Sequence, residues 1–123
     1  MNTWLWIVAV LLCLAFAGSG LLKLTTARER LVAADMGWVE DFSDGAVKGI
    51  GVLEVLAALG LVVSPFVGLP WLVPAAAIGL MLLMVGAAYT HYRRGEVQMI
   101  AVNGSLLVVA AFVAYGRIGP SPL

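Results

Sequence analysis

The chain has few of the side chains on which soluble enzymes depend. Charged residues make up 11% of its 123 positions, about half the share found in an ordinary soluble domain. The single cysteine, Cys13, excludes an internal disulfide and a Cys-x-x-Cys redox motif. One cysteine and one histidine make no credible metal site. No phosphate-binding loop, nucleophile elbow or haem-attachment motif is present. These absences leave enzymatic activity undecided and favour a binding or accessory subunit over a stand-alone enzyme.

What the chain has in excess is apolar side chains. Hydrophobic residues account for 63% of the sequence. A soluble domain of this length could not bury so many of them, because small domains keep a large exposed fraction. The expected solvent is therefore membrane lipid. The formal net charge is +0, so nothing in the composition indicates nucleic acid as a partner.

Four apolar segments are long enough to cross a bilayer as helices, at about 1.5 Å of rise per residue. Short links with Pro65, Pro70 and Gly95 separate the last three segments, which favours antiparallel neighbours. We therefore expect an all-α membrane protein, a single domain over residues 1–123 that forms an antiparallel bundle of four transmembrane helices. The predicted helices cover about 3–23, 46–64, 71–92 and 97–116.

The first apolar segment also resembles a secretory signal peptide, because Ala15-Phe-Ala17 precedes Gly18 in the manner of an Ala-x-Ala cleavage site. Two features favour a retained transmembrane helix instead. The residues before Trp4 include no lysine or arginine, and the apolar run continues past the cleavage position to Leu22. We expect a retained helix, and the sequence leaves cleavage open.

The segment 24–45 between the first two spanning helices is amphipathic. Its apolar residues recur every three or four positions, and its charged residues fall largely elsewhere. The apolar set is Leu24, Ala27, Leu31, Ala34, Trp38 and Phe42, and the charged set includes Arg28, Glu29, Arg30 and Asp35. We expect a helix or a pair of helical turns, interrupted at Gly37, that lies on the membrane surface or caps the bundle. A solvated connecting loop is the alternative.

Lysine and arginine gather on one side of the predicted bundle. Those at the first and third connections are Lys23, Arg28, Arg30, Lys48, Arg93 and Arg94. The positive-inside rule then places the loops 24–45 and 93–96 in the cytoplasm and both termini outside. Arg117 lies near the opposite side, where we expect its side chain to extend to the membrane surface. The prediction is a multi-pass integral protein of the cell membrane.

Glu54 is the carboxylate within a predicted span. A charge in the bilayer interior costs about 2.5–3.5 kcal/mol on insertion scales, so this side chain should face protein or water rather than lipid. Its helical neighbours Gly51, Ala57 and Ala58 are small, which suits a face packed against another helix. Glu54 is therefore predicted to point into the bundle.

Glu54 belongs to a set of polar residues that the four helices place in one half of the membrane. The set comprises Lys23, Lys48, Glu54, His91 and Asn103. We interpret these residues as a ligand-binding pocket that opens toward the basic side. Narrower alternatives stay open: Glu54 could form only a structural salt bridge with Lys23 or Lys48. His91 could be a simple interfacial residue, and Asn103 could join two helices by a hydrogen bond.

Short motifs occur along nearly the whole chain in one order. They are Ala17-Gly-Ser-Gly-Leu-Leu-Lys-Leu24, Val47-Lys-Gly-Ile-Gly-Val-Leu-Glu54, the Pro65 turn, Gly86-Ala-Ala-Tyr-Thr-His91 with Arg93-Arg94-Gly95-Glu96, Asn103, and Gly116-Arg117. In this arrangement the chain resembles the DoxX-like family. The resemblance implies a small four-helix integral protein of the bacterial inner membrane, with Lys23, Glu54, His91 and Asn103 at the family's recurring polar positions.

The resemblance also implies classes of function. DoxX relatives are linked with quinone-coupled membrane oxidoreductases and with a mycobacterial membrane complex that handles oxidative stress. Distant relatives act as receptor-assembly chaperones or bind sterol-like and cationic amphiphiles. The absence of a cysteine pair argues against direct thiol chemistry in this chain.

Three functions therefore compete. The first is an accessory subunit of a membrane redox system that binds a quinone or another small hydrophobic ligand, with Glu54 exchanging a proton or hydrogen bond. The second is a non-catalytic assembly factor, in which the network of Glu54 and lysine only holds the bundle and a lipid-facing surface recruits a membrane or redox protein. The third is a carrier for a small amphiphile whose amine pairs with Glu54. Stripes of small residues permit a homodimer without requiring one.

Overall fold

The structure, a computed structural model, describes residues 1–34 and 36–123; Asp35, which belongs to the predicted amphipathic segment, lies outside the described residues. Within the described residues every regular element is a helix. Four of the helices are long and apolar enough to cross a membrane. They are α1 (Asn2–Thr25), α3 (Asp44–Val62), α4 (Leu72–Arg93) and α5 (Val97–Ile118). The predicted all-α fold with four membrane-spanning helices is confirmed.

Capping and turn residues set the ends of α3. The helix begins where the hydroxyl of Ser43 accepts a hydrogen bond from the backbone N–H of Ala46 at 3.1 Å, which satisfies one of the free donors of the first turn. After α3 the chain forms the short 3-10 helix η2 (Ser64–Val67), and Gly68 follows with φ 79°. Glycine adopts this left-handed conformation without steric cost, so the chain can reverse toward α4.

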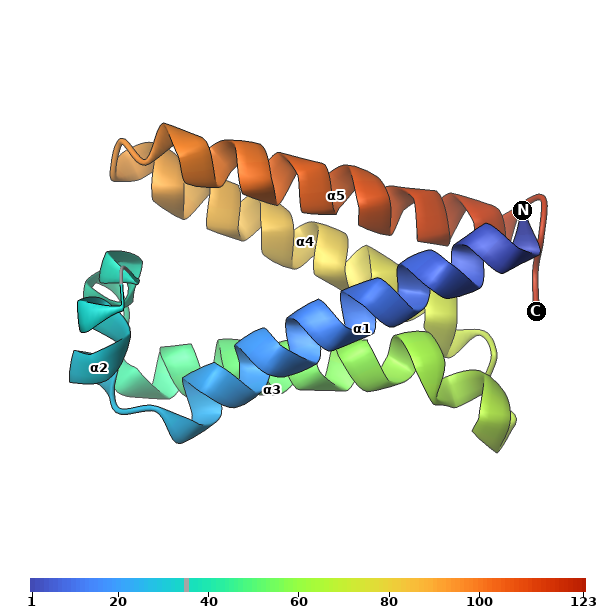
Figure 1. The fold of residues 1–123 in the computed structure, drawn as a ribbon, viewed down its shortest axis with the longest axis horizontal. Coiled ribbons are helices and arrows are strands. Elements are labelled where there is room, and N and C mark those ends of the chain that lie inside the picture. The colour runs from blue at the N-terminus through green and yellow to red at the C-terminus, as the bar shows by residue number, and fades with distance from the viewer. Residues whose placement is uncertain (35) are drawn as a thin grey trace.

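The four long helices form two closely packed pairs (Figure 1). α1 packs mainly against α3, and α4 packs mainly against α5. The two pairs meet at the end that carries both termini and diverge toward the other end. All four helices contribute to the apolar core: Ala9, Leu12, Phe16, Ala58, Leu61, Val73, Ala77, Leu80, Met84, Ala110, Val113 and Ala114.

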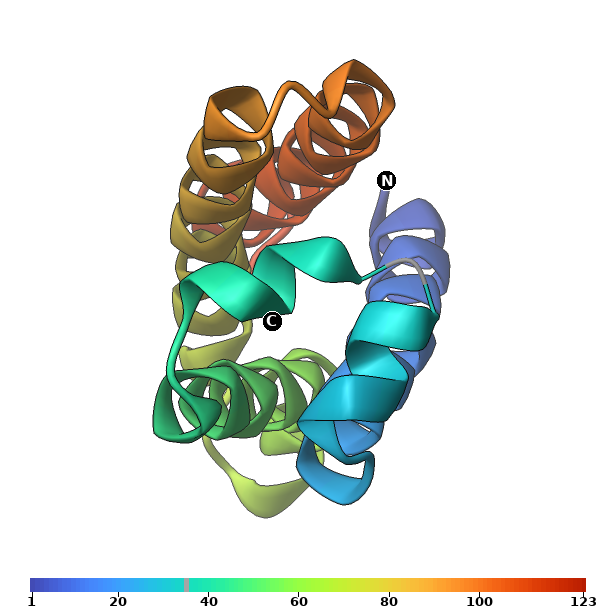
Figure 2. The same ribbon diagram turned by 90° about the vertical axis from the view of Figure 1, so that its left-hand side faces the viewer.

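The amphipathic segment covers the diverging end as two short helices, α2 (Arg28–Ala33) and the 3-10 helix η1 (Gly37–Asp41). Seen along the bundle, α2 lies over α1, and η1 crosses between the two helix pairs (Figure 2). The inner side of the segment is apolar, because Leu31 and Val39 are buried together with Val47 of α3. The predicted amphipathic segment is confirmed, and it caps the bundle.

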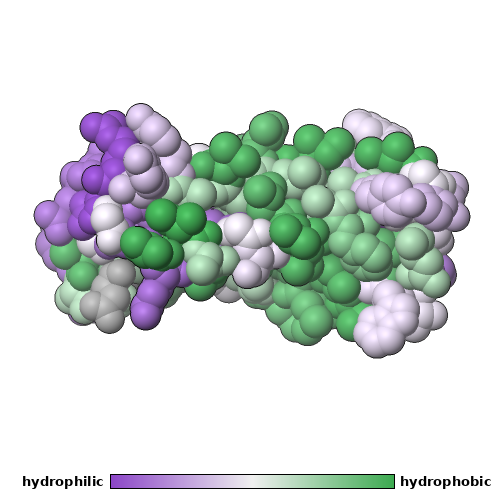
Figure 3. All heavy atoms as spheres, turned by 90° about the horizontal axis from the view of Figure 1, so that it is seen from above, coloured by the Kyte–Doolittle hydropathy of each residue, from purple (hydrophilic) through white to green (hydrophobic). Residues whose placement is uncertain are grey.

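The molecular surface changes polarity along its long axis (Figure 3). Hydrophilic side chains gather at the capped end, and the middle of the molecule is mostly apolar. Only 22–28% of each spanning window is buried inside the bundle, and large apolar side chains on all four long helices are exposed, Leu14, Leu56, Leu82 and Val108 among them. A belt of this kind needs lipid as its solvent. The protein is therefore a multi-pass integral membrane protein.

Arg117, in the last turn of α5, is buried, and the expectation that it extends to the membrane surface is wrong. It is 5% exposed. Its guanidinium donates hydrogen bonds to the side-chain oxygen of Asn2 at 2.7 Å and to the carbonyl oxygen of Ser121 at 2.9 Å. It also lies 5.7 Å from the ring centroid of Trp6, within the range of a cation–π contact. Arg117 thus ties α5 to the first turns of α1 at the end where the helix pairs meet.

Candidate functional site

α1 and α3 approach each other at two glycines beside the buried ion pair. A Cβ atom placed on Gly20 would lie 2.6 Å from the carbonyl oxygen of Gly51, and one placed on Gly51 would lie 2.9 Å from the carbonyl oxygen of Gly20. A side chain at either position would separate the two backbones. Lys23 and Glu54 each follow their glycine by about one helical turn. The close approach therefore brings the long lysine side chain within reach of the carboxylate.

Glu54 has a counter-ion inside the bundle. Its Oε1 lies 2.7 Å from Nζ of Lys23, and the two residues are 4% and 5% exposed. The same ammonium group donates a hydrogen bond to Oγ of Ser19 at 2.6 Å and lies 5.6 Å from the ring centroid of Trp38 in η1. The ion pair neutralises the Glu54 carboxylate, which would be costly as an isolated charge inside the membrane. Of the two lysines predicted as partners for Glu54, the structure selects Lys23.

Lys48 has a different role from that of the other predicted site residues. Its Nζ donates hydrogen bonds to the carbonyl oxygens of Lys23 at 2.6 Å and Thr26 at 3.1 Å. These carbonyls belong to the C-terminal end of α1, where helices leave acceptors free and favour positive charge. Lys48 thus caps α1 and holds the helix end that carries Lys23.

The ion pair forms part of the wall of a cavity of about 1080 Å³. Four of the five predicted site residues line this cavity: Lys23, Glu54, His91 and Asn103. Each of the four is at most 6% exposed. Much of the remaining wall is apolar and comes from all four long helices and η1, including Phe16, Trp38, Ile50, Leu83, Met84 and Leu106. A largely apolar hollow with a few convergent polar groups is the usual form of a small-molecule site.

Two residues of this wall have a buried donor without a hydrogen-bond partner, Asn103 and Arg94. The Nε of Arg94 still faces a carboxylate oxygen, that of Glu96 at 3.3 Å, whereas Asn103 has no such neighbour among the ion pairs and hydrogen bonds of the described residues. Asn103 is 6% exposed, and its Nδ2 is buried without a hydrogen-bond partner among residues 1–34 and 36–123. This nitrogen therefore does not join two helices, which was the alternative reading of Asn103. Nor do the described residues include a group of three or more His, Cys, Asp or Glu side chains placed to hold a metal ion.

Comparison with known proteins identifies the family. The model of the DoxX-like family matches residues 7–113, which is most of the chain and includes the whole cavity wall. The chain belongs to the DoxX-like family. No curated protein and no solved structure matches it.

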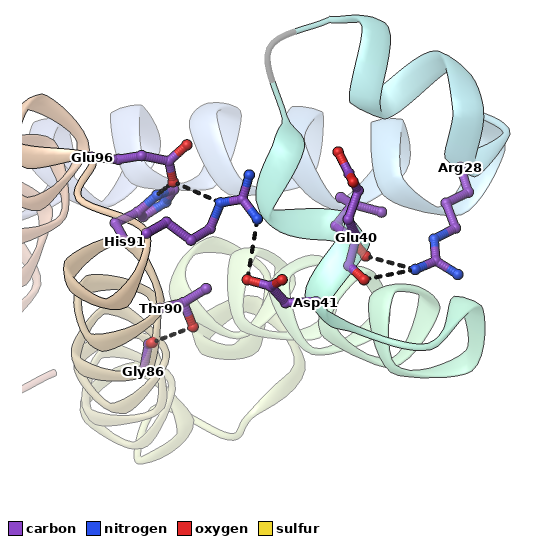
Figure 4. Close-up of polar contacts among 9 residues, drawn as sticks. Arg28, Glu40, Asp41, Gly86, Thr90, His91 and Glu96 are labelled. Atoms are coloured by element: carbon purple, nitrogen blue, oxygen red, sulfur yellow. Dashed lines mark hydrogen bonds and ion pairs between the residues drawn. The ribbon is translucent and has the colours of Figure 1, made fainter.

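Polar contacts at the capped end of this DoxX-like protein join η1 to the turn between α4 and α5 (Figure 4). Nδ1 of His91 lies 2.7 Å from Oε1 of Glu96. Nε of Arg94 lies 3.3 Å from the same oxygen, and its Nη1 donates to Oδ2 of Asp41 in η1 at 3.2 Å. From the other side, Arg28 of α2 donates to two backbone carbonyl oxygens of η1 at 3.2 and 3.1 Å. We call Asp41, His91, Arg94 and Glu96 the polar latch.

Sequence reasoning missed the latch as a unit. The turn 93–96 is visible in the sequence, and Gly95 adopts φ 72° there, but Asp41 is 53 residues away from Arg94. Only the placement of η1 across the diverging helix pairs brings these residues together (Figure 2). Three latch residues, Asp41, His91 and Arg94, also line the cavity. The latch is therefore part of the candidate site.

The contacts of the latch shift the pKa values of Glu96 and Arg94. The hydrogen bond with His91, and with it the charge of Arg94, lowers the pKa of Glu96 below its usual value. The hydrogen bond with Asp41 raises the pKa of Arg94, so the guanidinium stays charged. A carboxylate with a lowered folded-state pKa stabilises the fold at pH values above its unfolded pKa. That contribution is lost as the pH falls through the lowered folded value.

We expect Glu96→Gln to be slightly less stable than wild type near neutral pH, with a difference that shrinks in acid. The effect is small because the ion pair of Arg94 and Glu96 is partly exposed to solvent, and exposed pairs contribute little to stability. The measurement is the melting temperature of both proteins in detergent at about pH 7 and about pH 3.5, on either side of an ordinary glutamate pKa. Glu40→Gln, at an exposed carboxylate of η1, is the control. A difference that stays constant with pH would contradict this assignment.

Proposed function

We propose that this DoxX-like protein is an accessory subunit of a membrane redox system and binds a quinone or a similar small hydrophobic molecule in its cavity. The observation that supports this most is the cavity itself, which combines an apolar wall with the buried side chains of Lys23, Glu54, His91 and Asn103. Its volume of about 1080 Å³ is slightly above the usual range for small-molecule sites, about 300–1,000 Å³.

The arrangement suits a ligand with a polar head and an apolar body. The head would lie beside Asn103 and the ion pair of Lys23 and Glu54, where a proton or hydrogen bond could be exchanged. The body would contact apolar side chains such as Phe16 and Leu83. Lys48, which the sequence predicts as a ligand-binding residue, does not line the cavity and would act indirectly by holding the end of α1.

We further propose that the capped end of the bundle faces the cytoplasm. The capped end carries Lys23, Arg28, Arg30, Lys48, Arg93 and Arg94, whereas the other end of the bundle carries Arg117. Under the positive-inside rule, loops 24–45 and 93–96 are cytoplasmic and both termini lie outside. A ligand head bound under η1 would then lie in the cytoplasmic half of the membrane.

One observation favours the second candidate function, a non-catalytic assembly factor. Lys23 lies 2.7 Å from the carboxylate of Glu54, so the pair could serve the bundle alone, and the protein would then act through a partner at its lipid-facing surface. The same contact weighs against an amine carrier, because a cationic ligand would have to displace Lys23. The size and lining of the cavity favour the ligand-binding function over both.

The test is a thermal-stability titration of purified protein in detergent with a short-chain quinone. We expect a saturable rise in the melting temperature of wild type, equivalent to about 2.7 kcal/mol at a ligand concentration of about one hundred times Kd. Glu54→Gln should lose most of this rise. An alkane of the quinone's chain length is the ligand control. Ser64→Ala, which changes a buried hydroxyl outside the cavity wall, is the protein control.

Two results would contradict the proposal. If quinone leaves the melting temperature of wild type unchanged while Glu54→Gln alone lowers it, the carboxylate is structural and the assembly-factor function leads. If Glu54→Gln and Ser64→Ala respond to quinone as wild type does, quinone binds without Glu54, and the assigned role of this residue is wrong.

A further inference from the structure

We infer that Asn103 selects the ligand of the cavity, and that this ligand is an uncharged hydrophobic molecule whose polar end is a hydrogen-bond-accepting carbonyl. The inference rests on the proposed function, namely that the cavity binds a small hydrophobic molecule. It adds the residue that distinguishes among such molecules, and it excludes the basic amines and the plain hydrocarbons.

The starting point is the buried donor. Nδ2 of Asn103 has no partner in the part of the chain that the structure describes, although the residue is 6% exposed and lines the cavity. Folding has removed this nitrogen from water without replacing its hydrogen bond, which is costly. An amide nitrogen can only donate, so the group that satisfies it must be an acceptor. In a cavity with an apolar wall, a carbonyl on a hydrophobic ligand meets this requirement.

The other three predicted site residues of the wall already have partners. Glu54 is paired with Lys23 at 2.7 Å, and the same lysine donates to Ser19. The ring of His91 is held by Glu96 at 2.7 Å. A ligand amine would therefore have to break the pair of Glu54 and Lys23 and would meet the ammonium of Lys23. A carbonyl has no such conflict, because its oxygen can accept from Asn103 while the ion pair stays intact.

The position of Asn103 sets the depth of the ligand head. Asn103 is six residues beyond Val97, the first residue of α5, which corresponds to about 9 Å along the helix axis. The carbonyl would lie at this depth, beneath the polar latch. Leu106 follows on the same side of α5 and also lines the cavity, as do Phe16 of α1 and Leu83 of α4. These side chains offer an apolar surface to the body of the ligand.

The experiment compares four probes of matched chain length: an alkyl benzoquinone, an aliphatic ketone, a primary amine and an alkane. Apparent affinities come from melting-temperature titrations of wild type, Asn103→Leu, Asn103→Ala and the control Ser105→Ala in detergent. Ser105 lies on the same helix, is exposed, and donates to the carbonyl oxygen of Ala101. We expect wild type to prefer the two carbonyl probes, and both Asn103 variants to bind them about tenfold more weakly.

The melting temperatures of the variants without ligand show whether weaker binding results from misfolding. Asn103→Leu replaces the unpaired donor by an apolar group of similar size, so its melting temperature without ligand should equal or exceed that of wild type. Asn103→Ala adds no volume and provides a second test if leucine does not fit. Ser105→Ala should bind every probe as wild type does.

The outcomes distinguish a failure of this inference from a failure of the proposed function. If quinone stabilises wild type and the Asn103 variants equally, the inference is overturned and the proposed function stands. If the ketone but not the quinone binds, and does so through Asn103, the inference holds and the quinone assignment fails. A preference of wild type for the amine or the alkane overturns the inference. If no probe stabilises wild type, both proposals are overturned.

Discussion

Lys23→Met is expected to lower the free energy of unfolding by about 3–5 kcal/mol, because it leaves the carboxylate of Glu54 buried without a counter-ion. The two side chains are 7% and 5% exposed and 2.7 Å apart, so solvent cannot replace the lysine. Adding Glu54→Gln to Lys23→Met should recover most of this loss, since buried pairs replaced on both sides are often neutral. The measurement is unfolding in detergent of wild type, both single variants and the double variant.

Lys48→Met is the matched control. Lys48 lies close to the same pair in the structure but donates to backbone carbonyl oxygens at the end of α1. Losing hydrogen bonds from a charged donor should cost about 1.5–3 kcal/mol, and Glu54→Gln should not restore this loss. The opposite pattern, with rescue of Lys48→Met and none of Lys23→Met, would show that the carboxylate pairs with Lys48.

The same double variant also bears on function. If the variant with both Lys23→Met and Glu54→Gln folds well and still binds the carbonyl probes, the ion pair belongs to the scaffold and Asn103 determines binding. If the double variant folds well but no longer binds them, the pair acts in ligand recognition as well as in stability. Stability and binding are thus separable at this site.

The helices were predictable because the signals that define them are local. Long apolar runs, Ser43 before α3, and the breakers Pro65 and Gly95 mark the element ends within a few positions. The pairing of α1 with α3 was not predictable, because helices that are apolar on most sides show little periodicity to mark the buried face. Gly20 and Gly51 are the residues at which α1 and α3 make their close approach. Glycine is common in spanning helices, however, so its presence alone does not indicate a helix contact.

The sequence predicted which residues form the candidate site, but it did not predict which of them contact one another. Lys23, Glu54, His91 and Asn103 were placed together because each is polar and lies at a similar depth, and the structure brings all four to one cavity. The sequence offered both Lys23 and Lys48 as partners for Glu54, since residue spacing locates a side chain only to within a turn. Contacts between distant segments, such as those of the latch, depend on how the cap lies across the bundle and have no local signal.

Gly20→Ala is expected to destabilise the protein by about 1–3 kcal/mol, the usual cost of overpacking. The new Cβ would lie 2.6 Å from the backbone carbonyl oxygen of Gly51 and 2.7 Å from a methyl group of Val55, so α1 and α3 would have to separate. Gly18→Ala is the matched control on the same helix, because its Cβ would meet no described atom within 4 Å. That substitution should be neutral or slightly stabilising, since alanine favours a helix more than glycine does.

The glycine substitution also tests how the ion pair is held. If the close approach of α1 and α3 positions Lys23 against Glu54, separating the helices weakens an electrostatic contact as well as packing. Gly20→Ala should then cost less in a background that already carries Lys23→Met and Glu54→Gln than it costs in wild type, a non-additivity of about 0.5–3 kcal/mol for residues in contact. If Gly20→Ala lowers stability equally in the two backgrounds, Lys23 pairs with Glu54 independently of the close approach at the glycines. A lower cost in the uncharged background would make Gly20 and Gly51 functional parts of the site, because its only buried carboxylate among the described residues would depend on them.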